Sequence, residues 1–425
     1  MRRVLLALLG VLLLGAVGYG AVRLMSHSTL GELRRDGPAA VVRPAQGTPQ
    51  LWVIGKRPEE GPGVRRGSWR GGRVQHLELS GYDTVTGDLR WTRRLRSLDD
   101  DEGGHGAQAR ILGPDGERVW LFVHDQPVAV AAADGAVRAT LPDIAAANPG
   151  LRELLPRKLD EYLFDEGLVF IAADGRRLRI AGDGLVATPY EPRSVDDFNQ
   201  RRFMAGRWHG GYETRRFLTP QSRTPQRWIG LYTDEEAREA GNDGFGDNMK
   251  QPDRTWRDDR LARRGLWTAA IGRTKQFSEG SHERLVPPLR RLAQSADYLQ
   301  GGFLRDAGRP TPLLLDGAGL LLLHRTRIDE AGRALLSRVD IGADLQPRVR
   351  WEAALPFTEL HSRWQLPDRL LMIGQSQQDD GDRGRRTAEH LAIVDLRDGR
   401  VRTRDLLKPE AGEASGAGAS GAAGR

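Results

Sequence analysis

The chain has 425 residues, with 64 lysines and arginines against 57 acidic residues and a formal net charge of +7. It contains no cysteine, which excludes structural disulfides, thiol catalysis, Cys-ligated zinc, iron–sulfur clusters and c-type haem attachment. The basic residues are spread along the chain and form no patch with interleaved aromatics, so the composition argues against a nucleic-acid binder. The length suffices for one large domain or two ordinary ones.

The N-terminus carries an uncharged, largely apolar run from residue 4 to residue 22, preceded by Arg2 and Arg3. This run is close to the ~20 residues that a membrane-spanning helix needs. We therefore expect residues 1–25 to form a signal-anchor helix in the inner membrane of a bacterium. The arginine pair should stay cytoplasmic, which sends the bulk of the chain to the periplasm. A cleaved signal peptide is the alternative, although its small-x-small sites are poor.

Polar residues with Gly37-Pro38 and Pro44 predict a linker over 26–48. Alternating or apolar segments bounded by turn residues then predict short strands. These expected strand regions are 49–57, 74–83, 89–95, 118–124, 127–132, 136–141, 167–180, 202–208, 212–218, 227–233, 265–274, 311–327, 334–356, 368–377 and 389–407.

Two helices interrupt this pattern. One is expected after Asn148-Pro149, within 147–164, and the other within 283–302, after its two prolines. The segment 186–310 is atypical because its strand pattern is weak. The tail 410–425 is low in complexity and is expected to be disordered, so the folded body spans 49–409.

The stretch GYDTVTGDLRWTRRL, residues 81–95, predicts a hairpin whose turn contains Thr86 and Gly87. Counting Asp83 as position 0, Thr86 is at +3, Gly87 at +4 and Trp91 at +8. An Asx-Gly or Thr-Gly turn suits the positive φ that such a hairpin requires. The Trp at +8 offers a large apolar area to a neighbouring sheet.

The same spacing recurs along the chain. The turn glycine returns 48 residues later, and again after a further 40 residues. Periods of about 40–50 residues are typical of β-propeller blades. The recurring positions are Asp134 and Gly135; Asp174 and Gly175; Asp340 and Trp351, with three extra residues between them; and Asp395, Asp398 and Gly399.

The pattern Y-D-x-x-T-G-x-x-x-W at residues 82–91 resembles the blade motif of quinoprotein-type, PQQ-repeat-like β-propellers. The resemblance covers 49–185 and 311–407. The whole chain is also similar to uncharacterised membrane-anchored bacterial envelope propeller proteins. The resemblance implies an all-β propeller of about six to eight blades with a few short helices, in which the motif residues are structural.

No catalytic, cofactor-binding or metal-binding residue is assigned. The acidic stretch 99–105 lacks the liganding spacing of an EF-hand and is interpreted as a solvated loop. The stretch 242–248 is interpreted as a glycine-rich turn, with calcium binding by Asp243 and Asp247 as the alternative. The histidines form no H-x-H or HExxH pair. We expect a non-catalytic scaffold that binds an envelope protein through the loops 58–72 and 97–106 or the segment 186–310. The alternative is a quinone- or calcium-dependent periplasmic oxidoreductase, although the chain cannot form the vicinal disulfide that many quinoproteins carry.

Overall fold

The computed structural model describes residues 29–406, except 31–32, 61–72, 100–107, 195–212, 215, 219–226, 243–261, 276–280, 307–311, 318, 330–331 and 380–384. In these residues the chain forms 28 strands and only short helices, and every strand pairing is antiparallel. The expected all-β class is therefore confirmed. The chain divides into two compact units, 1–84 with 88–208 and 407–425, and 85–87 with 209–406. The body expected as one domain over 49–409 thus consists of two units.

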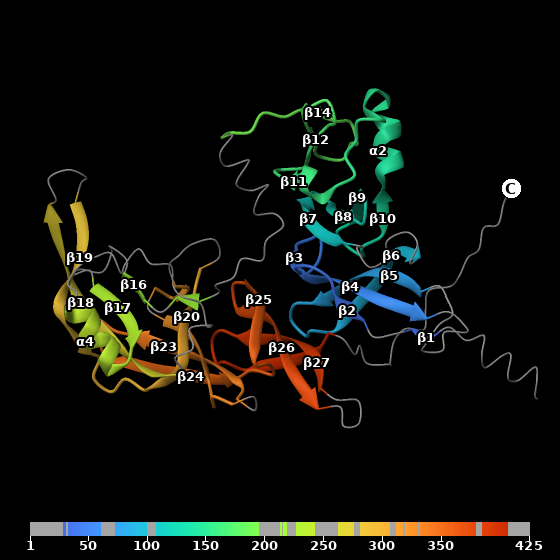
Figure 1. Ribbon diagram of the computed structural model, residues 1–425. Helices are drawn as coiled ribbons and strands as arrows, with labels where there is room; N and C mark the ends of the chain where they lie inside the picture. Colours follow the sequence, from blue (N-terminus) through green and yellow to red (C-terminus); the bar gives the residue numbers. More distant parts are fainter. Residues whose placement is uncertain are drawn as a thin grey trace, which may run out of the picture. The chain divides into compact units, whose positions relative to one another are not determined.

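The first unit contains three sheets that follow one another along the chain (Figure 1). Sheet I is β1 (Thr29–Leu30), β2 (Arg34–Arg35), β3 (Ala40–Val42), β4 (Gln50–Glu60), β5 (Arg73–Asp83) and β6 (Leu89–Asp99). Sheet II is β7 (Ala109–Asp115), β8 (Arg118–Val123), β9 (Gln126–Ala131) and β10 (Val137–Ala139). Sheet III is β11 (Tyr162–Phe164), β12 (Leu168–Ile171), β13 (Arg177–Ile180) and β14 (Thr188–Pro189), and α2 (Leu141–Ala147), η3 (Pro149–Leu151) and η4 (Leu159–Glu161) connect sheets II and III.

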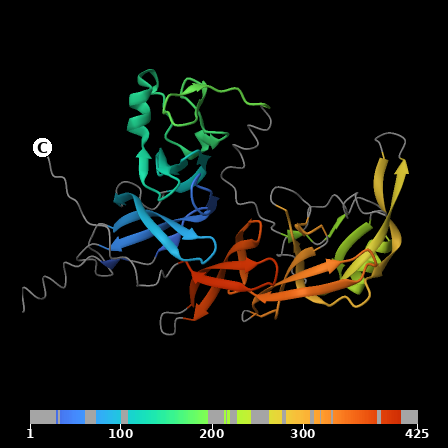
Figure 2. The same ribbon diagram turned by 180° about the vertical axis from the view of Figure 1, so that it is seen from behind.

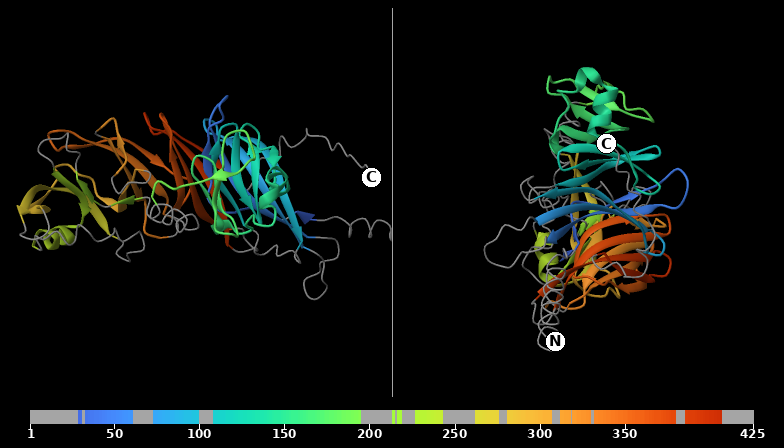
Figure 3. Two further views of the ribbon diagram at one scale, coloured as in Figure 1. Left: turned by 90° about the horizontal axis from the view of Figure 1, so that it is seen from above. Right: turned by 90° about the vertical axis from the view of Figure 1, so that its right-hand side faces the viewer.

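Sheet II lies between the other two sheets of this unit, which Figure 3 shows from two sides. Its strand β8 alternates: Val119 and Leu121 join an apolar layer with sheet I, while Trp120 and Phe122 join a layer with sheet III. A strand buried on both faces needs apolar residues at every position. This is why residues 119–123, VWLFV, form one continuous apolar run.

The second unit contains two sheets, seen from behind in Figure 2. Sheet IV has ten strands: β15 (Glu213–Thr214), β16 (Arg216–Leu218), β17 (Arg227–Tyr232), β18 (Arg263–Lys275), β19 (Ser281–Arg291), β20 (Tyr298–Leu304), β21 (Leu314–Leu315), β22 (Gly319–Arg325), β23 (Ala334–Ile341) and β24 (Pro347–Ala354). Sheet V is β25 (Glu359–Gln365), β26 (Arg369–Asp379), β27 (Arg385–Asp395) and β28 (Val401–Asp405), and the helix of this unit is α4 (Asp234–Asn242).

The strand β22 repeats the arrangement of β8. Its Leu320 and Leu322 pack with β17 and β18, while Leu321 and Leu323 pack with sheet V. The β21–β24 part of sheet IV is therefore buried on both faces, like sheet II of the first unit. Runs of four consecutive antiparallel strands occur in both units, namely β3–β6, β7–β10, β11–β14, β16–β19, β21–β24 and β25–β28.

The expected linker over 26–48 is corrected by the structure. From Thr29 onward it contains β1, β2 and β3, which all pair with β4. The polar and proline-containing sequence suggested a linker. Its short strands are nevertheless long enough to pair with β4 and to form one edge of sheet I. Among the residues that the structure describes, no helix is long and apolar enough to cross a membrane, and both the run 4–22 and the tail 410–425 lie outside them.

The helix expected within 147–164 is present only as the two short 3-10 helices η3 and η4, and the helix expected within 283–302 is wrong. The α-helix α2 lies earlier in the chain, where the Asp143 carboxylate accepts a hydrogen bond from the Thr140 backbone N–H (2.8 Å) and caps its start. Most of 283–302 lies in β19 and β20. β19 tolerates its two prolines because it pairs only with β18 and is an edge strand.

One helix was not expected from the sequence. Thr233 and Glu236 form a reciprocal capping box at the start of α4, with hydrogen bonds of 2.9 and 3.1 Å. The expected strand at 202–208 lies outside the described residues.

Candidate functional site

The recurring hairpin turns share one backbone geometry. The position-0 N–H donates to the carbonyl five residues on in three of them, Asp83 to Asp88 (2.8 Å), Ala131 to Ala136 (2.8 Å) and Asp395 to Arg400 (2.9 Å). Their glycines have φ of +80° at Gly87, +69° at Gly135 and +74° at Gly399. Glycine adopts this conformation without the steric cost that a Cβ brings.

These turns also share a place in the topology. The turns at 84–88, 132–136, 342–346 and 396–400 each join the third and fourth strands of a four-stranded run. The turn at Asp174-Gly175 differs, because it joins β12 and β13, the second and third strands of its sheet. This turn has the same residue types but a different place in its sheet. The interval of 40 residues between Gly135 and Gly175 is therefore not the period of a structural repeat.

In the first unit, Trp91 of β6 packs against the glycine turn of the next sheet. A Cβ at Gly135 would lie 2.4 Å from the Trp91 ring, so only glycine fits beneath it. Gln50 fixes the ring: its Oε1 accepts hydrogen bonds from Nε1 of Trp91 (2.9 Å) and of Trp52 (3.1 Å). The Gln50 Nε2 donates to the Ala133 carbonyl in the turn itself (2.9 Å).

In the second unit, Trp351 of β24 packs in the same way against the turn of sheet V. A Cβ at Gly399 would lie 2.7 Å from the indole ring. The Trp351 Nε1 donates to the Leu396 carbonyl (3.3 Å), so a main-chain group takes the role that Gln50 has in the first unit. Both tryptophans therefore join one sheet to the turn of the following sheet.

The motif carboxylates bind arginines and turn amides. Asp83 accepts hydrogen bonds from Arg90, and Asp340 accepts them from Arg338 (3.1 Å) and Arg350 (2.7 Å). Burial alone would raise the pKa of Asp340, but these arginines outweigh it and the pKa is lowered. The remaining motif carboxylates accept the backbone N–H two residues ahead, at 2.9–3.1 Å: Asp134, Asp174, Asp395 and Asp398.

The sequence reading missed an arginine at position +7, immediately before the aromatic position. Arg90 holds this position, and Arg350 holds the equivalent one at +10, directly before Trp351; both pair with the position-0 carboxylate. Arg138 and Arg402 stand at the same spacing in the two other turns. A comparison of the hairpins beyond the Asp, Gly and Trp positions could have found it.

Two arginines also link sheets, the buried Arg118 and the partly buried Arg338. The Arg118 Nη1 donates to the Gly184 carbonyl (2.8 Å), and its other nitrogens bind Asp115. In the second unit the Arg338 Nη1 donates to the Leu396 carbonyl (3.3 Å). Charged hydrogen bonds to a carbonyl of the next sheet fix the stacking more specifically than apolar contact does.

Three histidines each contact a serine hydroxyl on the neighbouring strand at 2.8 Å: His76 with Ser97, His324 with Ser337, and His390 with Ser376. Around His324, the Ser337 hydroxyl donates to Glu352 (3.1 Å) and the Tyr298 ring packs edge-on with centroids 5.1 Å apart. Burial lowers the pKa of His324 and raises that of Tyr298 to about 12. Ser337 is fully buried, so this group cannot present a nucleophile to a substrate.

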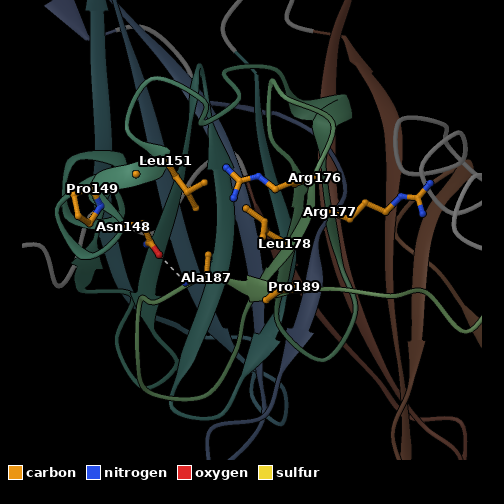
Figure 4. Close-up of a pocket in the computed structure, with 9 residues that line it drawn as sticks. Asn148, Pro149, Leu151, Arg176, Arg177, Leu178, Ala187 and Pro189 are labelled. Carbon is orange, nitrogen blue, oxygen red and sulfur yellow. Dashed lines mark hydrogen bonds between the residues drawn. The ribbon is translucent and has the colours of Figure 1, made fainter.

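A cavity of about 390 Å³ lies beside η3, β13 and β14 (Figure 4). Asn148 in its wall donates to the Ile144 and Leu185 carbonyls and accepts from the Ala187 N–H, each at 2.8 Å. Arg176 reaches over the cavity but also binds Asp174 (2.7 Å), and this contact lowers the pKa of Asp174. The hydrogen bonds of the Asn148 side chain thus hold together the backbone segments that form the cavity wall.

Within the described parts of the chain, no group of three or more histidine, aspartate or glutamate side chains could hold a metal ion. The acidic stretches 99–105 and 242–248 lie almost wholly outside those parts, as do residues 61–72 and 100–106 of the expected interaction loops. No protein-family model matches the chain, and no curated protein matches it.

Proposed function

We propose that this chain is a membrane-anchored, periplasm-facing β-propeller of six blades that acts as a non-catalytic scaffold and binds a protein of the cell envelope. The propeller proposal is supported by the six runs of four antiparallel strands, which lie in the predicted range of six to eight. It is further supported by the packing within each unit, where apolar layers join successive runs.

One observation carries the scaffold proposal. The recognisable motif residues are used in packing: Trp91 covers Gly135, and Trp351 covers Gly399. A sequence pattern devoted to stacking sheets leaves recognition to the loops that the sheets hold in place. A partner protein would then be bound at loops on a rigid body, and the N-terminal anchor would keep that complex at the membrane.

The test is affinity capture of the full-length protein from detergent-solubilised membranes, followed by mass spectrometry. The structure limits the loop replacement to 61–72, since residues 58–60 belong to β4 and their removal would damage sheet I. Replacing the β26–β27 loop, 380–384, is the matched control. We expect a protein partner that is lost with the 61–72 replacement and kept with the control.

Two results would contradict the proposal. One is capture of the same proteins by all variants, including a variant in which both expected interaction loops, 61–72 and 100–106, are replaced. The other is a purified sample that holds a quinone or calcium and no protein, which would favour the oxidoreductase. An experimental structure of residues 29–406 tests the number of blades separately.

A further inference from the structure

The first three strands run along the full length of β4. Thr29 pairs with Glu60, Arg34 with Lys56, and Val42 with Gln50. The chain between 29 and 42 therefore enters sheet I at the Glu60 end of β4 and leaves it at the opposite end. An entering chain that is paired in this way has a fixed direction relative to the sheet.

The entry point lies close in sequence to the apolar run. Residues 23–28 separate the end of that run from Thr29. Fully extended, this connection reaches at most about 25 Å. β4 has 11 residues, so its two ends are about 33 Å apart at ~3.3 Å per residue. The tether is thus shorter than the sheet is long.

We infer that the Glu60 end of sheet I faces the phospholipid surface, and that the Gln50 end of β4 lies away from the membrane. This inference rests on the proposed N-terminal anchor. If residues 4–22 span the bilayer, the connection 23–28 keeps β1 within its reach of the membrane surface, and β1, β2 and β3 then run from that end of sheet I to the other. The tether holds the entry end near the headgroups, while the paired strands carry the opposite end outward.

Two exposed positions mark the two ends. Asp99 pairs with Val74, which in turn pairs with Glu59, so it lies in the entry row of sheet I. Ala133 lies beside the far end, because its carbonyl accepts a hydrogen bond from Gln50 (2.9 Å). The natural chain has no cysteine, so Asp99→Cys and Ala133→Cys each provide a single thiol for a label.

The experiment measures energy transfer from a donor dye at each position to acceptor lipids in liposomes that contain the full-length protein. Co-flotation with the liposomes is measured first and tests the anchor alone. We expect transfer from position 99 to exceed that from position 133 by about two-fold or more, because the two ends differ by ~33 Å along the strand. Equal or reversed transfer in protein that floats would overturn the inference, whereas failure to float would contradict the anchor.

A tether variant sharpens this result. A Gly/Ser insertion of about twenty residues between 25 and 26 extends the reach without changing sheet I. It should lower transfer from position 99 and remove most of the difference between the positions. If the difference persists unchanged, the reach of the chain does not set the orientation and the inference fails. Far-UV circular dichroism of each labelled variant establishes that the sheets are intact.

Discussion

The Trp91–Gly135 contact of the first unit and the Trp351–Gly399 contact of the second solve the same packing problem differently. In the first unit a side chain, Gln50, holds the indole N–H, whereas in the second a backbone carbonyl accepts it. The turns before the two tryptophans, 84–88 and 342–346, have the same length. Their fourth residue has a positive φ in both, but it is Gly87 (+80°) in the first and Leu345 (+59°) in the second. The apolar ring over glycine is thus the common requirement, and the polar partner can vary.

The burial of the two rings differs as well. Trp351 is 8% exposed and belongs to the apolar layer between β21–β24 and sheet V, while Trp91 is half-buried at the edge of its layer. The first contact gains a T-shaped contact with Trp52, with ring centroids 5.2 Å apart. We therefore expect the second contact to depend on burial and the first on its polar and aromatic partners.

Truncating the two tryptophans should give the largest effects. Trp351→Ala is expected to lower the free energy of unfolding by about 3–5 kcal/mol, as for other buried aromatic residues. Trp91→Ala should cost less, about 2–3 kcal/mol, because its ring is half-buried. Urea unfolding followed by far-UV circular dichroism measures both. Equal losses would contradict the proposed difference in burial.

Matched variants test the polar partners of the same rings. Gln50→Leu removes the acceptor of two indole N–H groups and should destabilise the first unit by about 1–3 kcal/mol. Trp351→Phe keeps an apolar ring and should recover most of the loss seen with alanine at that position. If Gln50→Leu is neutral, the amide does not hold the first contact.

Adding a methyl group at the glycines should have the next largest effect. Gly135→Ala and Gly399→Ala place a Cβ against an indole ring and strain a positive φ, so each should cost about 2–4 kcal/mol. Gly175→Ala is the matched control: its φ is +85°, but no atom lies within 4 Å of the added Cβ. It should therefore cost only about 1 kcal/mol.

A double-mutant cycle shows whether the ring causes the excess. Gly135→Ala combined with Trp91→Ala should be clearly less destabilising than the sum of the single changes, because the clash disappears with the ring. Additive losses would mean that the methyl group and the ring do not meet. The same chemical unfolding assay serves for all of these variants.

The turns were predictable because their chemistry is local. Asp134, Gly135, Asp398 and Gly399 could be placed from the sequence, since an Asx side chain and a positive φ involve only neighbouring residues. Which strands a turn joins is not a local property, and Asp174 shows this: its turn chemistry is the same, but it lies between different strands of its sheet.

Contacts between sheets were harder to predict. Gln50 lies 41 residues from Trp91 and 83 from Ala133, so no spacing rule connects them. Arg118 and Arg338 resemble ordinary charged residues in sequence, although their guanidinium groups are bonded to the next sheet. The predictions of a linker over 26–48 and of a helix within 283–302 failed for another reason: both segments pair at a sheet edge with the strand next to them in sequence, and this pairing overrides their polar and proline-containing composition.

The second unit should also carry a distinct pH dependence. Burial lowers the pKa of His324 below its ordinary value near 6.5, so the unfolded chain binds a proton first as the pH falls. Stability should therefore be full above pH ~6.5 and decrease toward more acidic pH. The free energy of unfolding of the wild-type protein and of His324→Gln is measured by urea unfolding between pH 7.5 and 5, at intervals of ~0.5 pH unit.

The decline should be shallower in His324→Gln, since the neutral amide can still meet the Ser337 hydroxyl but does not titrate. We attribute the part of the decline that remains in this variant to His390, because burial lowers its pKa as well. A variant with the wild-type slope would show that His324 does not titrate differently in the two states. His324→Gln combined with His390→Gln should flatten the curve further.

Changes at Leu345 should give the smallest effect, and they test why the turn 342–346 tolerates a bulky residue at φ +59°. Its side chain packs against the apolar cluster that contains Ile341 and Val339, and this burial offsets the strain. Leu345→Asn relieves the strain but loses the packing, so we expect the free energy of unfolding to change by less than about 1 kcal/mol. Leu345→Ala keeps the strain and loses most of the packing, and it should cost more. If Leu345→Asn costs as much as Leu345→Ala, the positive φ stores no strain, and only the packing of the side chain distinguishes this turn from the glycine turns.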